Sequence, residues 1–426
     1  MSLKKVLTLT AAPNRAFVLF AMLAAFCISG EYAITRPAST GLFLTFFSAD
    51  HLPTVWLATV PLNLLVVYLY NRFLPRFGPL KMLTTVVLIV IAINTSCAFL
   101  LSSFPWLIFL QFVCKDIYIL LMFKQLWSLI HVSVEQKNAK FLYGLIYGVG
   151  TAGSILCSSI PSFSAVAIGS ETLFLLTCPL YLMLLFAYRM AFRRSPLATG
   201  NFAETLTLDP RPKEALTLFK RNRFLIGVLL LVVFMQVSTG LLEYQFNTYL
   251  EHNIVDKDLR TAYCGKITGI VNILSGCFQF FGSWLMMHFL GLRGSHLFIP
   301  LVLLSNTLFF ALIPTFAIIS FSFVFLKSID FSLFGVIREM LYIPLKTDEK
   351  FRAKAVIDVF AYRTSKAVVS LFIISLQLIA GVQILPVVTA LSIAVFLGWL
   401  TMAFRMFKQQ PLPSAQSVPT AENNPR

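Results

Sequence analysis

The chain has 426 residues, of which 58% are hydrophobic and 42 are Phe, and its mean hydropathy is +0.82. A soluble domain of this size cannot hide that much apolar surface, so the composition excludes a soluble globular protein and indicates an integral membrane protein. The net charge of +16 would suit a nucleic-acid-binding protein. Most of the excess, however, lies in short loops beside apolar segments, where it is a topology signal, and no nucleic-acid partner is expected.

Apolar segments long enough to cross ~30 Å of hydrocarbon recur along the whole chain. They predict an all-α membrane protein with twelve transmembrane helices. The first fifteen residues have neither a long apolar core nor the character of a transit peptide, so no cleaved targeting segment is expected. The predicted helices span residues 16–36, 53–73, 82–102, 105–131, 141–162, 171–190, 224–248, 263–290, 295–316, 317–343, 353–380 and 383–405.

Charged side chains inside the first half of the predicted membrane region lie on the first and fourth helices. A charge at the middle of a membrane helix costs roughly 2.5 to 3.5 kcal/mol on insertion scales, so each of these side chains needs a partner or water. They are Glu31 and Arg36 on the first helix, and Lys115, Asp116 and Lys124 on the fourth.

In the second half, charged side chains lie on the seventh, tenth and eleventh helices. Because every third helix is charged, with a further cluster on the eleventh, we expect these helices to line a central water-filled cavity. The alternative is that the charges only pair with one another to hold the helices in register, as Lys327 and Asp330 could do three residues apart. These side chains are Glu243, then Lys327, Asp330, Arg338 and Glu339, then Asp358, Arg363 and Lys366.

The two parts of the chain repeat each other at offsets of 212 to 216 residues. An even number of helices in the repeat returns the chain to its starting side, so both copies have the same orientation and are related by an axis along the membrane normal. By analogy, this arrangement predicts a major-facilitator-like fold of two six-helix halves. The clearest recurring positions are Glu31-Tyr32 with Glu243-Tyr244, Asp116 with Asp330, and Lys124 with Arg338.

The charges of the loops predict the topology and the domain boundaries. Lys and Arg gather before the first helix and between helices 2 and 3, 4 and 5, 6 and 7, and 10 and 11, which puts both termini in the cytoplasm. Polar, Pro-containing stretches separate the predicted parts of the chain. We expect an N-terminal half at 1–190, a cytoplasmic linker at 191–223, a C-terminal half at 224–406 and a disordered tail at 407–426.

The mixed charges of the predicted cavity suit a gate of ion pairs with spare cations for an anionic solute. The repeated loops at 135–140 and 349–354 would either latch the halves or serve as solvated anchors. A small anionic solute and the lipid bilayer are the expected partners, and a monomer is the simplest assembly. The candidate substrate-binding residues are Arg36, Lys124, Glu243, Arg338 and Lys366, and the candidate gating or coupling residues are Glu31, Asp116, Asp330, Glu339 and Asp358.

Several of these segments resemble those of a known family, the ATP/ADP antiporters of plastids and obligate intracellular bacteria. The resemblance spans about residues 16–405. It implies exchange of nucleoside tri- and diphosphates across a bacterial inner membrane, with Arg36, Glu243 and Lys366 as functional positions. The segments that carry it are Arg338–Leu345, Lys354–Val359 and Ser365-Lys366 in the second half, and Tyr32–Arg36, Leu126-Trp127 and Asn138–Tyr143 in the first.

The chain departs from the family pattern at three positions, which indicates a divergent member. Pro37 and Ser39 stand where the family has an acid and a Lys, and Gln125 stands where it has an acid. The competing hypothesis is an ion-coupled major-facilitator-type carrier of another small anionic metabolite. In that carrier a carboxylate of the charged helices would titrate.

An enzyme and a non-transporting scaffold are the other classes of function to weigh. The five His have no metal-ligand spacing, and no phosphate-binding loop occurs, so neither a metal or cofactor site nor an ATP-driven pump is expected. A scaffold has no reason to bury so many charges in membrane helices.

Overall fold

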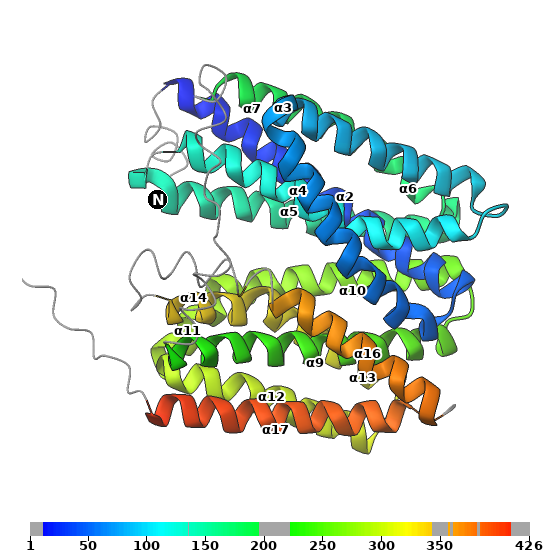
Figure 1. The fold of residues 1–426 in the computed structure, drawn as a ribbon, viewed down its shortest axis with the longest axis vertical. Helices are drawn as coiled ribbons and strands as arrows, with labels where there is room; N and C mark the ends of the chain where they lie inside the picture. The colour runs from blue at the N-terminus through cyan, green and yellow to red at the C-terminus, as the bar shows by residue number, and fades with distance from the viewer. Residues whose placement is uncertain are drawn as a thin grey trace, which may run out of the picture.

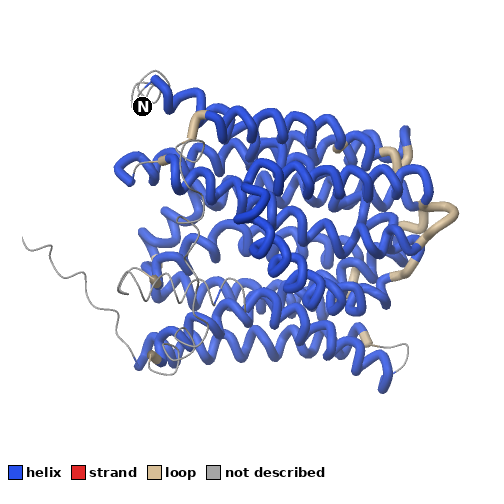
Figure 2. The backbone as a smooth tube through the Cα atoms, turned by 45° about the horizontal axis from the view of Figure 1, so that its top comes forward, coloured by secondary structure: helices blue, strands red, loops and turns tan. Residues whose placement is uncertain are grey.

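The computed structural model describes residues 12–134, 136–195, 222–342, 357, 361–380 and 384–409. These residues form helices joined by short loops (Figure 2). In chain order the elements are α2 (Ala12–Phe46), η1 (Ala49–His51), α3 (Leu52–Leu100), α4 (Trp106–Ser133), α5 (Gln136–Ile168), α6 (Leu173–Leu176), α7 (Cys178–Arg193), α9 (Arg223–Asn253), α10 (Lys257–Cys277), η3 (Phe278–Gly282), α11 (Ser283–Phe289), α12 (Gly291–Leu312), α13 (Phe316–Ile329), η4 (Asp330–Phe334), α14 (Gly335–Leu341), α16 (Tyr362–Ala380) and α17 (Leu385–Gln409).

The described helices confirm the all-α membrane fold, and each of the twelve predicted spans overlaps one of them. Ten helices in the described residues are long and apolar enough to cross a membrane. One of these, at 49–100, has 52 residues and contains two predicted spans. Gly78 separates them, since its φ of 72° and ψ of 165° are not helical. The eleventh predicted span corresponds to a shorter apolar helix, Thr364–Ile379.

The first membrane helix runs further than the sequence predicts. The predicted end was residue 36, directly before Pro37. In the structure α2 continues to Phe46. The hydroxyl of Thr40 also donates to the carbonyl of Arg36 at 2.9 Å, and the helix tolerates the single backbone bond that Pro37 cannot make to Ala33. The extension carries α2 across the full depth of the molecule.

The elements gather into two bundles (Figure 1). Helices α2 to α7 lie in the upper part of the view and α9 to α17 in the lower part. Across the boundary, α10 packs against α2 and α5, and α16 packs against α3. We call the bundles the N-terminal and C-terminal halves. The proposed linker and tail lie largely at 196–221 and 410–426, outside the described residues, so their boundaries stay predictions.

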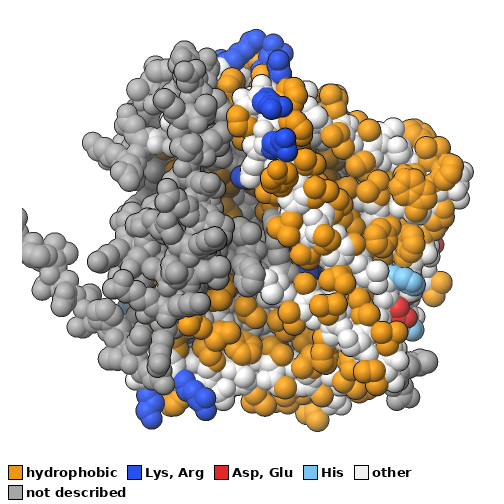
Figure 3. Space-filling view, viewed as in Figure 1, with side chains coloured by type: hydrophobic (Ala, Val, Ile, Leu, Met, Phe, Trp, Pro, Cys, Tyr) orange, Lys and Arg blue, Asp and Glu red, His pale blue; other side chains and the backbone are white. Residues whose placement is uncertain are grey.

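The outer surface of the helices is largely apolar on the face drawn in Figure 3, as lipid contact requires. Lys and Arg side chains are visible toward the end of the molecule where α2 begins, whereas acidic and His side chains are visible at the opposite edge. We call these the basic end and the opposite end. This asymmetry follows the distribution of loop charges in the sequence.

Glycines bring the two halves into close contact near the opposite end. A Cβ atom on Gly41 of α2 would lie 2.1 Å from Thr261 Oγ1 of α10. A Cβ atom on Gly265 of α10 would lie 2.7 Å from the backbone nitrogen of Ser162 in α5. Only glycine allows such approaches, because any side chain would overlap the facing helix. The halves therefore touch almost backbone to backbone there.

Candidate functional site

A cavity of about 560 Å³ lies between the two halves. It reaches from the middle of α2 toward the basic end, where α5 starts and α14 lies (Figure 1). A smaller pocket beside it shares Arg36 and reaches Glu243 and Lys327. Polar and aromatic side chains of both halves line the larger cavity, among them Tyr32, Arg36, Trp127, Tyr147, Asn272, Gln279, Asp330 and Arg338.

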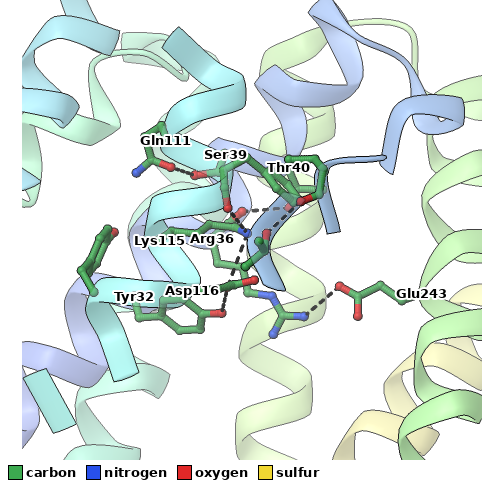
Figure 4. Close-up of polar contacts among 12 residues, drawn as sticks. Tyr32, Arg36, Ser39, Thr40, Gln111, Lys115, Asp116 and Glu243 are labelled. Carbon is green, nitrogen blue, oxygen red and sulfur yellow. Dashed lines mark hydrogen bonds and ion pairs between the residues drawn. The ribbon is translucent and has the colours of Figure 1, made fainter. Parts of the chain in front are cut away.

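The carboxylate of Glu243 on α9 accepts contacts from two cations of different halves. Its Oε1 lies 3.6 Å from a guanidinium nitrogen of Arg36 on α2, in the N-terminal half (Figure 4). Its Oε2 lies 2.9 Å from Nζ of Lys327 on α13, in its own half. Lys327 is almost completely buried. Glu243 therefore neutralises charges that would otherwise be costly at this depth.

The carboxylate of Asp116 on α4 likewise contacts one cation of its own half and one of the other half. The Tyr32 hydroxyl donates to its Oδ1 at 3.0 Å, and Lys115 Nζ lies 3.5 Å from the same oxygen (Figure 4). Its Oδ2 lies 3.7 Å from Nζ of Lys366 on α16, in the C-terminal half. That ammonium also lies 5.1 Å from the centre of the Trp56 ring. Each half thus supplies a carboxylate to a cation of the other half.

The charges of this ionic cluster do not balance. We define the cluster as the cations Arg36, Lys115, Lys327 and Lys366 and the carboxylates Asp116 and Glu243. Four positive charges face two negative ones, so the cluster has two positive charges in excess. This excess attracts an anion to the cluster.

The structure brings four predicted site residues together, namely Arg36, Asp116, Glu243 and Lys366. Asp330 and Arg338 lie on the cavity wall. Asp330 accepts from Gln236 Nε2 at 3.1 Å rather than pairing with Lys327, which contacts Glu243. Local spacing therefore gave the wrong partner for Lys327, because a cross-helix contact competes with the contact three residues away.

Other predicted site residues lie apart from the ionic cluster. Lys124 donates to Asn71 at 2.8 Å within the N-terminal half and does not line the cavity. Glu31 is buried in the same half, where its Oε1 accepts from Thr35 at 2.6 Å and from Tyr118 at 2.9 Å. These positions do not support direct contact of either residue with a solute in this conformation.

The remaining predicted features lie outside the ionic cluster or outside the described residues. Glu339 lies on α14, 3.6 Å from a guanidinium nitrogen of its neighbour Arg338. Asp358 lies outside the described residues, as do Glu135 and the loop at 349–354. Among the described residues, no group of His, Cys, Asp or Glu side chains could hold a metal ion.

The sequence placed Lys115 and Lys327 among the charges expected to line the cavity, but it did not select them or Tyr32 as substrate-binding or gating residues. Sequence shows that Lys327 is inside a membrane helix, but only the packing of α9 against α13 shows that Glu243 is its partner. The π-helical turns η3 and η4, which contact each other, had no sequence signal that we recognised. Such turns often occur at functional sites, and both contribute to the cavity wall.

Polar contacts close the gap between the halves at the opposite end. Asp258 Oδ1, at the start of α10, accepts from the backbone nitrogen of Ser170 at 2.7 Å and from its hydroxyl at 2.6 Å. Lys257 pairs with Glu171. We call these four residues the latch. The backbone nitrogen of Ala49 also donates to Glu251 across the boundary, at 2.6 Å.

More contacts support the latch. Asp50 accepts from the Tyr244 hydroxyl at 3.3 Å with its side chain and from Gln377 at 3.0 Å with its backbone carbonyl. Arg260 donates to Thr45 Oγ1 at 3.1 Å. Because the cavity extends toward the basic end while these contacts join the halves at the opposite end, the structure is a conformation closed at the opposite end.

Known proteins resemble this chain in both sequence and fold. Residues 205–410, nearly half of the chain, match the family model described as "TLC ATP/ADP transporter". ADP,ATP carrier protein 1 of Chlamydia muridarum is 25% identical over 262 residues, which is 53% of this chain and 49% of that protein. The protein of the same name from Chlamydia trachomatis serovar D is 25% identical over 236 residues, 49% of this chain and 44% of that one. The chain thus aligns with about half the length of these relatives.

Several solved structures of transporters have a similar fold. The nucleoside transporter NupG matches with a TM-score of 0.62 at 15% identity, covering 94% of this chain and 100% of that one. A bacterial homologue of ferroportin in an inward-facing state matches with a TM-score of 0.67 at 14% identity, covering 95% and 99%. A D-xylose–proton symporter gives 0.64 at 12% identity, covering 92% and 97%.

At these identities the structures establish the fold alone, which is that of the major facilitators, as the repeat predicted. The family match and the curated relatives confirm the resemblance read from the sequence. Over residues 205–410 this chain is therefore similar to the TLC ATP/ADP transporter family, and its similarity to the chlamydial ADP,ATP carrier proteins is distant, at 25% identity.

Proposed function

We propose that this protein exchanges nucleotides across a membrane, in the manner of ATP/ADP antiport, by alternating access of one central site. The observation that carries the proposal is the ionic cluster, which joins both halves at the cavity and has two positive charges in excess. The membrane we propose is a bacterial inner membrane, with both termini in the cytoplasm.

The ion pairs of the cluster give a physical reason for exchange rather than one-way movement. In this structure Arg36 is paired with Glu243 and Lys366 with Asp116. The phosphates of a bound nucleotide would compete with these carboxylates for the same cations. Each charge-assisted contact contributes about 1.5–3 kcal/mol, so exchanging carboxylate for phosphate is close to balanced. A solute arriving from one side would then replace one leaving from the other.

Access would alternate because the halves rock about the ionic cluster. In the present conformation the latch closes the opposite end, while the cavity extends to the basic end. Opening the opposite end requires the latch to break. Solute binding can drive this change only if the solute binds the two conformations with different free energies.

The second candidate function is an ion-coupled carrier of a different small anionic metabolite. Two neutral, buried positions favour it. Ser39 donates to Gln111 at 2.9 Å, and Gln125 accepts from the Tyr70 hydroxyl at 2.8 Å, so neither offers a charge to a phosphate. These are two of the positions at which the sequence departs from the antiporter pattern.

Counterflow in proteoliposomes tests the proposal. Vesicles loaded with unlabelled ADP should take up labelled ATP, and empty vesicles should not. Other nucleotides and inorganic phosphate on the inside would define the substrate class. Uptake that needs an imposed pH gradient and no internal nucleotide would reject exchange and select the ion-coupled carrier.

A further inference from the structure

Two aromatic rings of the N-terminal half form an open surface in the cavity. Trp127 of α4 and Tyr147 of α5 both line it, with ring centroids 5.8 Å apart and planes inclined at 32°. Tyr147 is 57% exposed although it lies in a membrane-spanning helix. Tyr143 also packs against Trp127, with ring centroids 5.5 Å apart, but does not line the cavity. Tyr147 therefore presents a π-surface held in place by a packed neighbour.

Two amide side chains of the C-terminal half line the same cavity. Asn272 lies on α10, and Gln279 lies seven residues later in the π-helical turn η3. Within the part of the chain that the structure describes, neither amide makes a hydrogen bond to protein. An amide offers both donors and an acceptor, and at membrane depth these groups need partners from water or a solute. Their free donors and acceptors point to a ligand that has polar edges.

A third group connects this region with the charges. Arg338 of α14 lines the cavity from the C-terminal half. The wall of one cavity therefore has an aromatic surface, two amides without a hydrogen bond to the described residues, and a cation, while Arg36 on the same wall also belongs to the ionic cluster. A simple inorganic anion would use the cations alone. A ligand that uses all three kinds of group has a flat aromatic part with hydrogen-bonding edges and a separate anionic part.

We propose that Tyr147 and Trp127 form a stacking platform for the heteroaromatic base of a nucleotide, and that Asn272 and Gln279 contact the edge of that base. This inference rests on the proposed function and adds to it the location of the base. Stacking supplies affinity with little selectivity, because every base has a π-surface. Selectivity between bases comes from the amides, since adenine and guanine differ in their edge donors and acceptors. The base then joins both halves, as the ion pairs do.

Binding measurements on the purified full-length protein can separate the base from the phosphates. The probes are ATP and inorganic tripolyphosphate, which has the phosphates without the base. Wild-type protein should bind ATP more tightly than tripolyphosphate. Tyr147→Ala should weaken ATP binding by roughly 5- to 100-fold, the range of one stacking contact. Tripolyphosphate binding should stay unchanged, which also shows that the variant is folded.

Matched variants make the result specific. Tyr147→Phe keeps the ring and should keep ATP affinity, whereas Tyr147→Leu keeps bulk without a π-surface and should lose it. Tyr143→Ala removes a ring of the same cluster that does not line the cavity, and it should change neither affinity. Gln279→Leu should change the ratio of the ATP and GTP affinities while leaving tripolyphosphate binding intact.

Each contrary result has a distinct meaning. Equal wild-type affinities for ATP and tripolyphosphate would overturn the base subsite while leaving the anion site standing. The same conclusion follows if Tyr147→Ala and Tyr147→Leu weaken both probes alike, or if they weaken neither. If the wild-type protein neither binds nor exchanges nucleotides, the proposed function fails and the base subsite fails with it.

Discussion

The carboxylate of Asp116 lies 3.7 Å from the ammonium of Lys366, across the boundary between the two halves. Since Asp116 also accepts from Tyr32 and contacts Lys115, its removal would leave two cations without their carboxylate.

We expect Lys366→Ala to lower exchange at least ~10-fold, because a charge-assisted contact to the solute is lost. Counterflow rates at matched amounts of protein measure this.

Reversing the pair separates a structural role from a solute-binding role. The double variant Asp116→Lys with Lys366→Asp keeps an ion pair between the helices but moves the cation to the other half. We expect it to be inserted and folded normally and yet remain inactive. Full recovery of exchange would mean that the pair serves only to hold α4 and α16 together.

Glu243 and its repeat equivalent Glu31 should respond differently to the same substitution. Glu243→Gln removes a charge paired with both Arg36 and Lys327, and we expect a loss of exchange of roughly 10- to 100-fold. Among the described residues, Glu31 accepts hydrogen bonds from Tyr and Thr hydroxyls, which the carbonyl oxygen of Gln can also accept. We expect Glu31→Gln to retain exchange within about threefold, since no ion pair is lost.

The comparison of these two variants also discriminates between the candidate functions. Both should be measured in the same counterflow assay, with the amount of folded protein determined by size-exclusion chromatography. A loss from Glu31→Gln as large as that from Glu243→Gln would contradict the expectation. It would make Glu31 a coupling carboxylate, as the ion-coupled carrier requires.

The latch predicts a reversible block. Ser170 and Asp258 are in direct contact, and replacing both with Cys places two thiols at the boundary between the halves. In a background without the seven native Cys, oxidation should cross-link them and stop exchange, and a reductant should restore it. The single-Cys variants serve as controls and should be unaffected by oxidation. Continued exchange by the fully cross-linked protein would show that the opposite end does not open during transport.

The close contact at Gly41 predicts a shift between conformations. A Cβ atom there would meet Thr261, so Gly41→Ala should disfavour closure of the opposite end. We expect the buried position Ser170, once replaced with Cys, to react faster with a water-soluble maleimide in this background. Gly144→Ala is the matched control, because a Cβ atom there meets no described atom within 4 Å. Equal labelling rates in the two backgrounds would count against a role of this contact in closure.

Much of the fold was accessible from sequence because its main determinants are local. A run of apolar residues long enough to cross the bilayer must be helical, since no other single segment satisfies its own backbone there. The repeat then fixed the relation of the halves. Boundaries were less accurate where proline and glycine have context-dependent effects: α2 continues through Pro37, and the helix of residues 49–100 bends at Gly78 without a loop.

The sequence predicted which residues form the site but not which of them contact one another. Because charged residues are rare in membrane helices, the sequence pointed to four of them as site residues. The structure brings these four together: Arg36, Asp116, Glu243 and Lys366. Which cation meets which carboxylate depends on helix packing between segments far apart in the chain. Equivalent positions of the repeat also diverged, because Glu243 faces the other half whereas Glu31 faces the interior of its own.

Each half supplies the carboxylate that pairs with a cation of the other half, and this affects how the protein inserts and folds during synthesis. The N-terminal half leaves the ribosome first, and at that moment Arg36 has no Glu243 to meet and Asp116 has no Lys366. Ionic side chains without counter-ions cost several kcal/mol in a bilayer. The newly inserted first bundle therefore contains charged side chains that are paired only after the second bundle inserts. We therefore expect the first six spans to reach their final packing only after the last six have been inserted, so that the two bundles fold as one cooperative unit.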